Sequence, residues 1–124
     1  MEERDPLTEA VIGAAIEVHR ILGPGLLESI YQRALCHELG LRGIRHVPQQ
    51  RLPVTYKGVE LGDDLRMDIL VEDQLVVELK AIDELLPIHE AQLLTYLRLS
   101  GHHTGLLLNF NVRLLKDGIK RRVL

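Results

Sequence analysis

Apolar residues recur at helical spacing in the first third of the chain and predict two helices there. The first covers residues 7–22 and ends at Gly23-Pro24-Gly25, a sequence that does not continue a helix. The second runs from Leu26 to Leu39, with Gly40 at the position of a C-terminal cap. The apolar stripes are Leu7, Val11, Ala14, Ala15, Val18 and Leu22 on the first helix, and Leu27, Ile30, Ala34 and Leu35 on the second.

Beyond Gly43 the pattern changes to short extended runs. Strands are predicted for residues 50–56, 65–71 and 75–80, with turns at Lys57-Gly58 and at residues 72–74. Helical spacing returns over residues 88–100, and two more strands cover 104–110 and 119–123. Strand 75–80, this helix and strand 104–110 fit a parallel βαβ crossover. The order predicts one α/β (α+β) domain over residues 1–124, with a central mixed sheet of about five strands flanked by three helices.

The two strands at 65–71 and 75–80 carry the clearest chemistry. Side chains alternate between the two faces of a strand. If residues 72–74 form a three-residue loop, Val71 faces Leu75 and Asp68 faces Glu78. One face then holds Met67, Ile69, Val71, Leu75, Val77 and Leu79. A two-residue loop would divide this apolar set between both faces, so burial selects the three-residue register.

The other face of this hairpin gathers Arg66, Asp68, Glu78 and Lys80. Two carboxylates side by side repel each other, and one of them tends to take up a proton. A divalent cation removes the repulsion, because hard cations prefer carboxylate oxygens. A surface charge cluster, in which Lys80 and Arg66 offset the two acids, is the alternative. The hairpin alone does not decide between the two.

The composition of the chain bears on where in the cell the protein is located. With one cysteine, Cys36, the chain has neither an internal disulfide framework nor a thiolate zinc cluster, and Cys36 itself is expected to be a small buried apolar residue. The polar start from Met1 to Asp5 is unlike a secretory signal, and no apolar run approaches the ~20 residues that span a bilayer. We therefore expect a cytoplasmic protein that is not associated with a membrane.

The net charge of −3 argues against coating nucleic acid by bulk electrostatics. Binding a polyanion then needs a bridging metal or a local basic patch. Lys116, Lys120, Arg121 and Arg122 offer such a patch, although a solvated strand edge explains these four equally well. Aromatic residues make up 3% of the chain, so few bases could be stacked. Neither a G-x-G-x-x-G motif after a strand nor a P-loop is present, which argues against an oxidoreductase or another small-molecule enzyme.

Two motifs in the second half of the chain resemble a known superfamily. Asp68 followed by Glu78-Leu79-Lys80 has the form D…E-x-K on a hairpin. Gln92 and Tyr96 form a Q-x-x-x-Y motif and share one helical face. Together they resemble the PD-(D/E)XK nuclease superfamily and its RecB-like branch. The residue before Asp68 is Met67 rather than Pro, a departure that removes no catalytic group.

A third motif lies upstream, where Gly25-Leu-Leu-Glu28-Ser-Ile-Tyr31 reads G-x-x-E-x-x-Y. It resembles the signature of the small GxxExxY family within the same superfamily. Further similar stretches are His19…Gly23-Pro24-Gly25, Gly105-Leu-Leu-Leu-Asn109-Phe110 and Lys116-Asp-Gly-Ile-Lys-Arg121. The resemblance covers nearly the whole chain.

This resemblance implies a restriction-endonuclease-like core and a nuclease that hydrolyses DNA with Mg²⁺ or Mn²⁺. The implied metal ligands are Glu28, Asp68, Glu78 and the carbonyl of Leu79. Lys80 would orient the attacking water or offset charge on the phosphate. Gln92 and Tyr96 would hold the phosphate or position Lys80.

A second hypothesis is a non-catalytic module that keeps the fold and binds nucleic acid or a partner protein. The nuclease is favoured by the intact set of Asp68, Glu78, Lys80 and Gln92, because a site that had lost its activity would not need these residues. The negative charge and the few aromatics favour the module. The nearly all-apolar first helix calls for a partner surface, so a homodimer is expected.

Several other polar residues have simpler interpretations. His19 is expected to bond the backbone near the Gly23-Pro24 turn, and Tyr31 is read as a packing residue. His102 and His103 are adjacent, and neighbouring residues of a strand point to opposite faces. We therefore do not expect these two histidines to chelate one metal ion.

Overall fold

The structure, a computed structural model, describes residues 5–62 and 64–124. The polar start predicted over Met1 to Arg4 lies outside the described residues. The first helix is confirmed: α1 (Pro6–Leu22) begins after Asp5, whose carboxylate accepts a hydrogen bond from the Thr8 N–H at 2.7 Å. It ends at Gly23, where a φ of 69° suits glycine. Of the predicted stripe, Leu22 is wrong, because it stays exposed at the helix end.

The second helix, α2 (Glu28–Leu41), differs from its prediction at both ends. It continues through Gly40, and Gly43 instead takes the left-handed conformation, with a φ of 70°. The helix stops there because the Ile44 N–H turns back to the Leu39 carbonyl, at 2.9 Å.

The buried face of α2 matches the prediction only in part. Leu35 is fully buried and Ala34 packs against the core, as predicted, but Tyr31 and Leu39 complete the buried face, while Leu27 is 72% and Ile30 38% exposed. Residues four apart stack along one side of a helix, so Tyr31, Leu35 and Leu39 form one continuous stripe. Both sets fit helical spacing, and only the position of α1 and the sheet selects between them.

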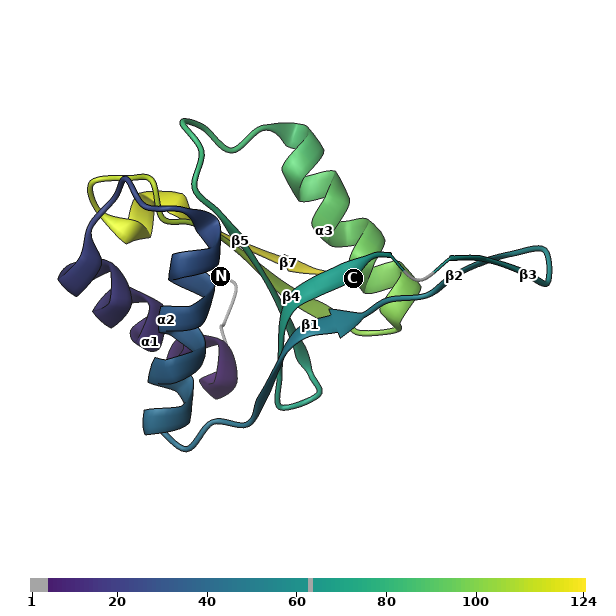
Figure 1. The fold of residues 1–124 in the computed structure, drawn as a ribbon, viewed down its shortest axis with the longest axis horizontal. Helices are drawn as coiled ribbons and strands as arrows, with labels where there is room; N and C mark the ends of the chain where they lie inside the picture. The colour runs from purple at the N-terminus through teal and green to yellow at the C-terminus, as the bar shows by residue number, and fades with distance from the viewer. Residues whose placement is uncertain (1–4, 63) are drawn as a thin grey trace.

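A five-stranded mixed sheet lies between the helices, in the order β1-β4-β5-β6-β7 (Figure 1). The remaining elements are β1 (His46–Arg51), β2 (Val54–Tyr56), β3 (Val59–Gly62), β4 (Arg66–Val71), β5 (Leu75–Lys80), α3 (Pro87–Ser100), β6 (Thr104–Asn109), η1 (Leu115–Gly118) and β7 (Ile119–Val123). Strands β5 and β6 pair in parallel through α3, and the other described neighbours are antiparallel. The predicted central sheet, its three helices and the βαβ crossover are confirmed.

The single strand predicted over residues 50–56 is wrong, because the chain forms β1 and β2 there. Leu52 turns inward and is buried, and Pro53 has no N–H to continue a ladder. β2 then pairs with β3 in a separate hairpin around the predicted Lys57-Gly58 turn. This hairpin projects from the body of the molecule, to the right in Figure 1.

The predicted register of the β4–β5 hairpin is confirmed. Val71 pairs with Leu75, Leu70 with Val76 and Ile69 with Val77. The next pair in this register is Asp68 with Glu78. The predicted register therefore holds, although apolar residues are buried on both faces of the hairpin rather than on one.

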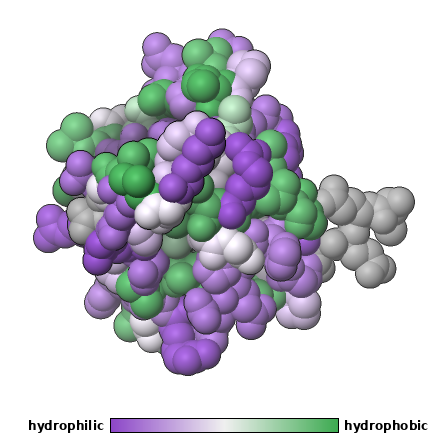
Figure 2. All heavy atoms as spheres, turned by 90° about the vertical axis from the view of Figure 1, so that its right-hand side faces the viewer, coloured by the Kyte–Doolittle hydropathy of each residue, from purple (hydrophilic) through white to green (hydrophobic). Residues whose placement is uncertain are grey.

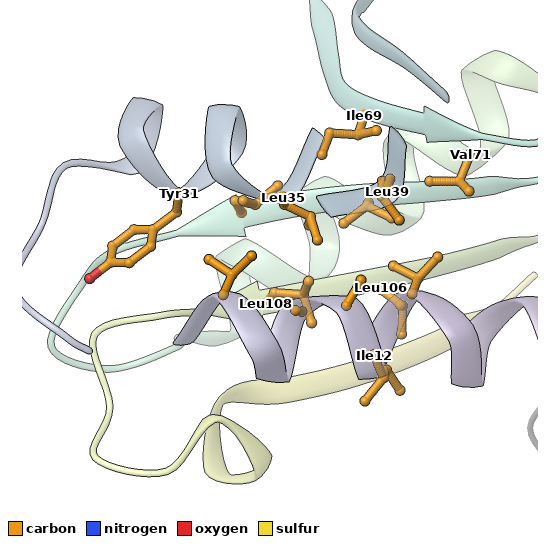
Figure 3. Packing of buried hydrophobic residues seen from close by; sticks show 14 of the residues in the cluster. Ile12, Tyr31, Leu35, Leu39, Ile69, Val71, Leu106 and Leu108 are labelled. Carbon is orange, nitrogen blue, oxygen red and sulfur yellow. The ribbon is translucent and has the colours of Figure 1, made fainter. Parts of the chain in front are cut away.

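Helices cover both faces of the sheet. α1 and α2 lie on one face, where Ile69, Val71, Leu106 and Leu108 meet Leu35 and Leu39 (Figure 3). α3 lies on the other face, where Leu93 and Leu97 contact Leu70, Val76 and Leu107. Met67, predicted with Ile69, is buried in this second cluster instead, together with Leu52. The face expected to be polar is thus polar only near Asp68 and Glu78.

The predicted basic patch is divided by ion pairs. Arg122 contacts Glu90 of α3, and Arg121 lies 3.6 Å from Asp5 at the start of α1. Lys116 and Lys120 are exposed. Because β7 side chains alternate between faces, these charges do not form one continuous surface.

The surface on the side of the β2–β3 hairpin is a mosaic of polar and apolar patches (Figure 2). Tyr56, Val59 and Leu61 of the hairpin are among its exposed apolar side chains. Among the described residues, no helix is long and apolar enough to cross a membrane.

Candidate active site

The β4–β5 hairpin changes character beyond the Ile69–Val77 pair. The Asp68 N–H donates a hydrogen bond to Glu78 Oε1 at 3.1 Å, and the Leu79 N–H donates to Asp68 Oδ2 at 2.8 Å. Each carboxylate thus takes the part that a backbone carbonyl plays in a regular ladder. The structure therefore brings the two predicted acids together on paired strands.

Glu78 is a buried acid, with 5% of its surface exposed. Its burial, followed by the negative charge of Asp68, raises the pKa of the Glu78 carboxyl from 4.5 to about 9. The hydrogen bond from the Asp68 N–H and the charge of Lys80 act in the opposite direction. At neutral pH the carboxyl of Glu78 holds a proton unless a cation replaces it.

Glu28 approaches the same site from the first turn of α2. Partial burial raises the pKa of its carboxyl, the positive charge of Lys80 lowers it, and the negative charge of Asp68 raises it. A hydrogen bond from the Ala81 N–H lowers this pKa. Glu28 therefore lies near the acid pair and the end of β5.

Tyr31 fixes the loop that leads to Glu28. Its hydroxyl donates to the Gly23 carbonyl at 2.5 Å and accepts the Leu26 N–H at 3.1 Å. Its ring stacks on Phe110, with 4.6 Å between the ring centroids. The packing role predicted for Tyr31 is confirmed, and the hydroxyl adds a loop-holding role that spacing alone does not reveal.

Lys80, Gln92 and Tyr96 form a chain of contacts between β5 and α3. Lys80 Nζ donates to Gln92 Oε1 at 3.2 Å, and Gln92 Nε2 donates to the Tyr96 hydroxyl at 3.4 Å. Partial burial raises the pKa of Tyr96, and the negative charges of Glu78 and Asp68 raise it further. The Tyr96 hydroxyl therefore faces the acid pair, while Gln92 holds the ammonium of Lys80.

Asn109 holds the chain directly after Lys80. Its side-chain oxygen accepts the Ile82 N–H at 3.1 Å, and its amide donates to the Ile82 carbonyl at 2.9 Å. The Phe110 N–H donates to the Lys80 carbonyl at 2.9 Å. The buried Asn109 amide thus continues the β5–β6 pairing past the last ladder residue. Sequence reasoning noted this asparagine only as part of a similar stretch.

The Leu79 carbonyl points toward Asp68. Carbonyls of successive residues in a strand point to opposite edges, and the Lys80 carbonyl is bonded to Phe110 on the β6 side. The N–H of Leu79 is bonded to Asp68 on the β4 side, and its carbonyl shares that side. The predicted backbone ligand is therefore directed to the edge that carries the acids.

The donor set fits a hard divalent cation. Asp68, Glu78, Glu28 and the Leu79 carbonyl offer oxygen atoms alone, which suits Mg²⁺ or Mn²⁺ better than a soft metal. Burial and the negative charge of Asp68 raise the pKa of Glu78, and a bound cation would offset the cost of ionising its carboxyl. Within residues 5–62 and 64–124, however, no three His, Cys, Asp or Glu side chains already form a cluster able to hold a metal ion.

Other candidate residues lie away from this site. His19 Nε2 lies 2.8 Å from the Val112 carbonyl oxygen, so it bonds backbone as expected, but its partner belongs to the segment after β6 that packs beside the Gly23-Pro24 turn. His102 lies 3.9 Å from Asp73, and His103 contacts the Leu124 carbonyl at 3.3 Å. Cys36 is only partly buried, against the core under α1 and α2, and its partial burial raises the pKa of its thiol.

Two surface hollows of about 600 Å³ are also separate from the acids. One is lined by residues 43–47 with Leu70, Glu72 and Asp73. The other lies between the end of α1 and η1, with Arg20, Arg113 and Lys116 in its lining. Neither contains Asp68 or Glu78. The acid pair is therefore not part of either hollow.

Comparison with known proteins gives one match. A model of the PD-(D/E)XK nuclease superfamily matches residues 5–122, which is nearly the whole chain. A search of curated proteins and a search of solved structures each found no match.

Proposed function

The chain belongs to the PD-(D/E)XK nuclease superfamily, and from this premise we propose that it is a Mg²⁺- or Mn²⁺-dependent nuclease that hydrolyses DNA. The observation that carries the proposal is the buried Glu78 carboxyl beside Asp68, with its pKa raised to about 9. A pair of acids this poorly compensated costs stability, and cation binding removes that cost.

Asp68, Glu78 and the Leu79 carbonyl would hold the metal ion, with Glu28 as the fourth oxygen donor. A bound divalent ion makes a water molecule more acidic and offsets charge on phosphate oxygens. Asp68 and Glu78 are fixed for this task because each accepts a backbone N–H of the opposite strand. Glu28 approaches the site from the first turn of α2.

Lys80 supplies the positive charge beside the acids. Its ammonium is held by Gln92, which in turn contacts the Tyr96 hydroxyl. From this position Lys80 stabilises negative charge on the phosphate in the transition state. Gln92 and Tyr96 would contribute by positioning Lys80 and by lining the space next to the acids.

We also propose that the chain is a member of the GxxExxY family and its RecB-like branch. The contacts of Tyr31 and Glu28 give two residues of the G-x-x-E-x-x-Y motif a physical purpose, because Tyr31 holds the loop from Gly23 to Leu26 that leads to Glu28. The Lys80–Gln92–Tyr96 contacts give the Q-x-x-x-Y motif a similar purpose.

The test compares wild-type protein with Asp68→Asn, Glu78→Gln and Asp73→Asn. Asp73 lies in the turn of the same hairpin and its side chain is 87% exposed, so it is a matched control. We expect Mg²⁺- or Mn²⁺-dependent cleavage by wild type and by Asp73→Asn, and none by the other two. Wild-type protein without cleavage of linear, nicked, branched or single-stranded DNA would contradict the proposal.

The second candidate is a non-catalytic module that binds nucleic acid or a protein. It is favoured by the finding that, among the described residues, no three His, Cys, Asp or Glu side chains are already grouped to hold a metal ion. Thermal unfolding with and without Mn²⁺ separates the two, because a ligand that binds the native state raises the melting temperature. Stabilisation that Asp68→Asn removes supports the nuclease.

We also propose that the chain forms a homodimer, through exposed apolar side chains rather than through the stripe of α1. The apolar stripe of α1 is buried within the chain, but Ile21, Leu27 and Leu114 remain exposed around the turn that joins α1 to α2 and near η1. Light scattering after size-exclusion chromatography tests it, and a monomer at micromolar concentration would contradict it. A cytoplasmic location is proposed as well, on the ground that the chain carries one cysteine.

A further inference from the structure

The strand next to the acid pair is distorted at one residue. β1 pairs regularly with β4 on both sides of this point, through Pro48 with Ile69 and Gln50 with Met67. Between them, Gln49 has a φ of 52°, in the left-handed region that non-glycine residues rarely adopt. In this register Gln49 stands opposite Asp68. The distortion therefore lies beside a proposed metal ligand.

The side chain of Gln49 uses this position to reach two elements. Its Nε2 donates to Gln32 Oε1 of α2 at 2.6 Å and contacts Asp68 Oδ1 of β4 at 3.5 Å. An amide nitrogen carries two N–H groups, so one donor can serve each oxygen. Gln32 is four residues after Glu28, on the same face of α2. Gln49 thus connects the helix that carries Glu28 with the strand that carries Asp68.

The contacts of Asp68 assign a separate partner to each of its oxygens. Oδ2 accepts the Leu79 N–H at 2.8 Å, and Oδ1 faces the Gln49 amide. An amide has no charge, so it orients the carboxylate without neutralising it. The 3.5 Å contact is long for a hydrogen bond, and such contacts around a site commonly shorten when the ligand binds.

Strain at Gln49 argues that its side chain has a use. Glycine would adopt this φ without strain, whereas glutamine costs free energy there. Strained residues that persist next to a site often belong to its mechanism. We propose that Gln49, held by Gln32, is a positioning residue that sets the orientation of the Asp68 carboxylate for the metal ion. This inference rests on the proposed metal-dependent function.

The test measures Mn²⁺ binding by calorimetry, together with the melting temperature of the metal-free protein. Gln49→Gly removes the side chain and relieves the backbone, so the melting temperature should stay the same or rise. The dissociation constant for Mn²⁺ should rise about tenfold, as for other residues that orient a metal ligand. Gln32→Ala should raise it by a smaller factor, and Gln50→Ala, at the neighbouring position, should leave it unchanged.

The outcomes separate this inference from the proposed function. If wild type binds Mn²⁺ and Asp68→Asn does not, but Gln49→Gly binds as tightly as wild type, Gln49 has no positioning role. A lower melting temperature with unchanged Mn²⁺ affinity would show that Gln49 only supports the strand, and would also overturn the inference. Wild-type protein that binds no Mn²⁺ would contradict both the inference and the proposed metal site.

Discussion

Two glutamates at opposite ends of the β4–β5 hairpin show how position determines the behaviour of one side chain. Glu72 lies in the exposed turn, where the Arg45 N–H donates to it at 2.8 Å and the Arg45 guanidinium pairs with it at 3.0 Å. These bonds lower the pKa of Glu72. Glu78 is buried at the other end beside Asp68, and its pKa is raised to about 9.

The two ends of the hairpin therefore have different tasks. Near the turn, fully buried apolar pairs such as Val71 with Leu75 stabilise the hairpin. At the open end, backbone N–H groups of Asp68 and Leu79 donate to carboxylates rather than to carbonyls. The stability gained at the apolar end offsets the cost of a buried acid, which is the arrangement expected when a hairpin must present charge inside a fold.

The largest effect is expected for Lys80→Met. Removing the ammonium next to the acids should lower DNA cleavage by roughly 10²–10³-fold, the usual effect of losing one transition-state charge partner. Mn²⁺ should still bind, because Lys80 is not a metal ligand. Arg45→Met, which removes the cation at the turn end, should leave the cleavage rate unchanged. Equal losses for both variants would break the comparison between the two ends.

The second effect concerns stability at the apolar end. Ile69 is fully buried one residue from Asp68. Ile69→Ala should lower the free energy of unfolding by about 2–5 kcal/mol, because it leaves a cavity in the core under α1 and α2. Asp68→Asn should change it far less, since asparagine keeps the oxygen that accepts the Leu79 N–H. Urea unfolding of both variants measures the difference, and a larger loss for Asp68→Asn would contradict it.

The third effect is a dependence of stability on pH. The folded pKa of Glu78, about 9, lies above its unfolded value of about 4.5, so the native state keeps a proton that the unfolded chain releases. Stability is therefore greatest below pH 4.5 for this group and is lost as the pH rises from about 5 to 9. The slope is at most ~1.4 kcal/mol per pH unit.

Glu78→Gln and Glu72→Gln test the pH dependence as a pair. Melting temperatures measured between pH 5 and 9 in a chelating buffer should fall for wild type and for Glu72→Gln. Glu78→Gln should remove the fall, because it has no proton to release. The lowered pKa of Glu72 has the opposite effect on stability. Its contribution to stability is present above the unfolded pKa and is lost as the pH falls through the folded pKa. A wild-type melting temperature that does not change with pH would show that the Glu78 carboxyl does not have a raised pKa in the folded protein.

The sequence predicted the hairpin register well and the neighbouring strand poorly, for one physical reason. The β4–β5 register follows from a period of two and from the burial of apolar residues, both of which are local. The path of residues 46–56 depends on Gln49 and Pro53, where a positive φ and a missing N–H redirect the chain. A loose alternation over residues 50–56 contains no signal for either event.

Contacts between distant segments escaped sequence reasoning in the same way. Gln32, Gln49 and Asn109 are polar residues without a motif role in the sequence, and each gains one only through its partner. The charge of Asp68 and the Ala81 N–H both affect the pKa of Glu28, and the contribution of Ala81 could not be read from the sequence. Side-chain amides recognise whatever donor or acceptor the fold brings near them, so their roles are tertiary.

By itself, the sequence determined the helices, most of the strands, and the position of two acids opposite each other on paired strands, because these follow from local periodicity and apolar burial. It is the packing of distant segments that buries Glu78, lets Tyr31 hold the loop before Glu28 and brings Gln49 next to Asp68. Burial and hydrogen-bond partners depend on which distant segments come together, and the pKa of Glu78 depends on both.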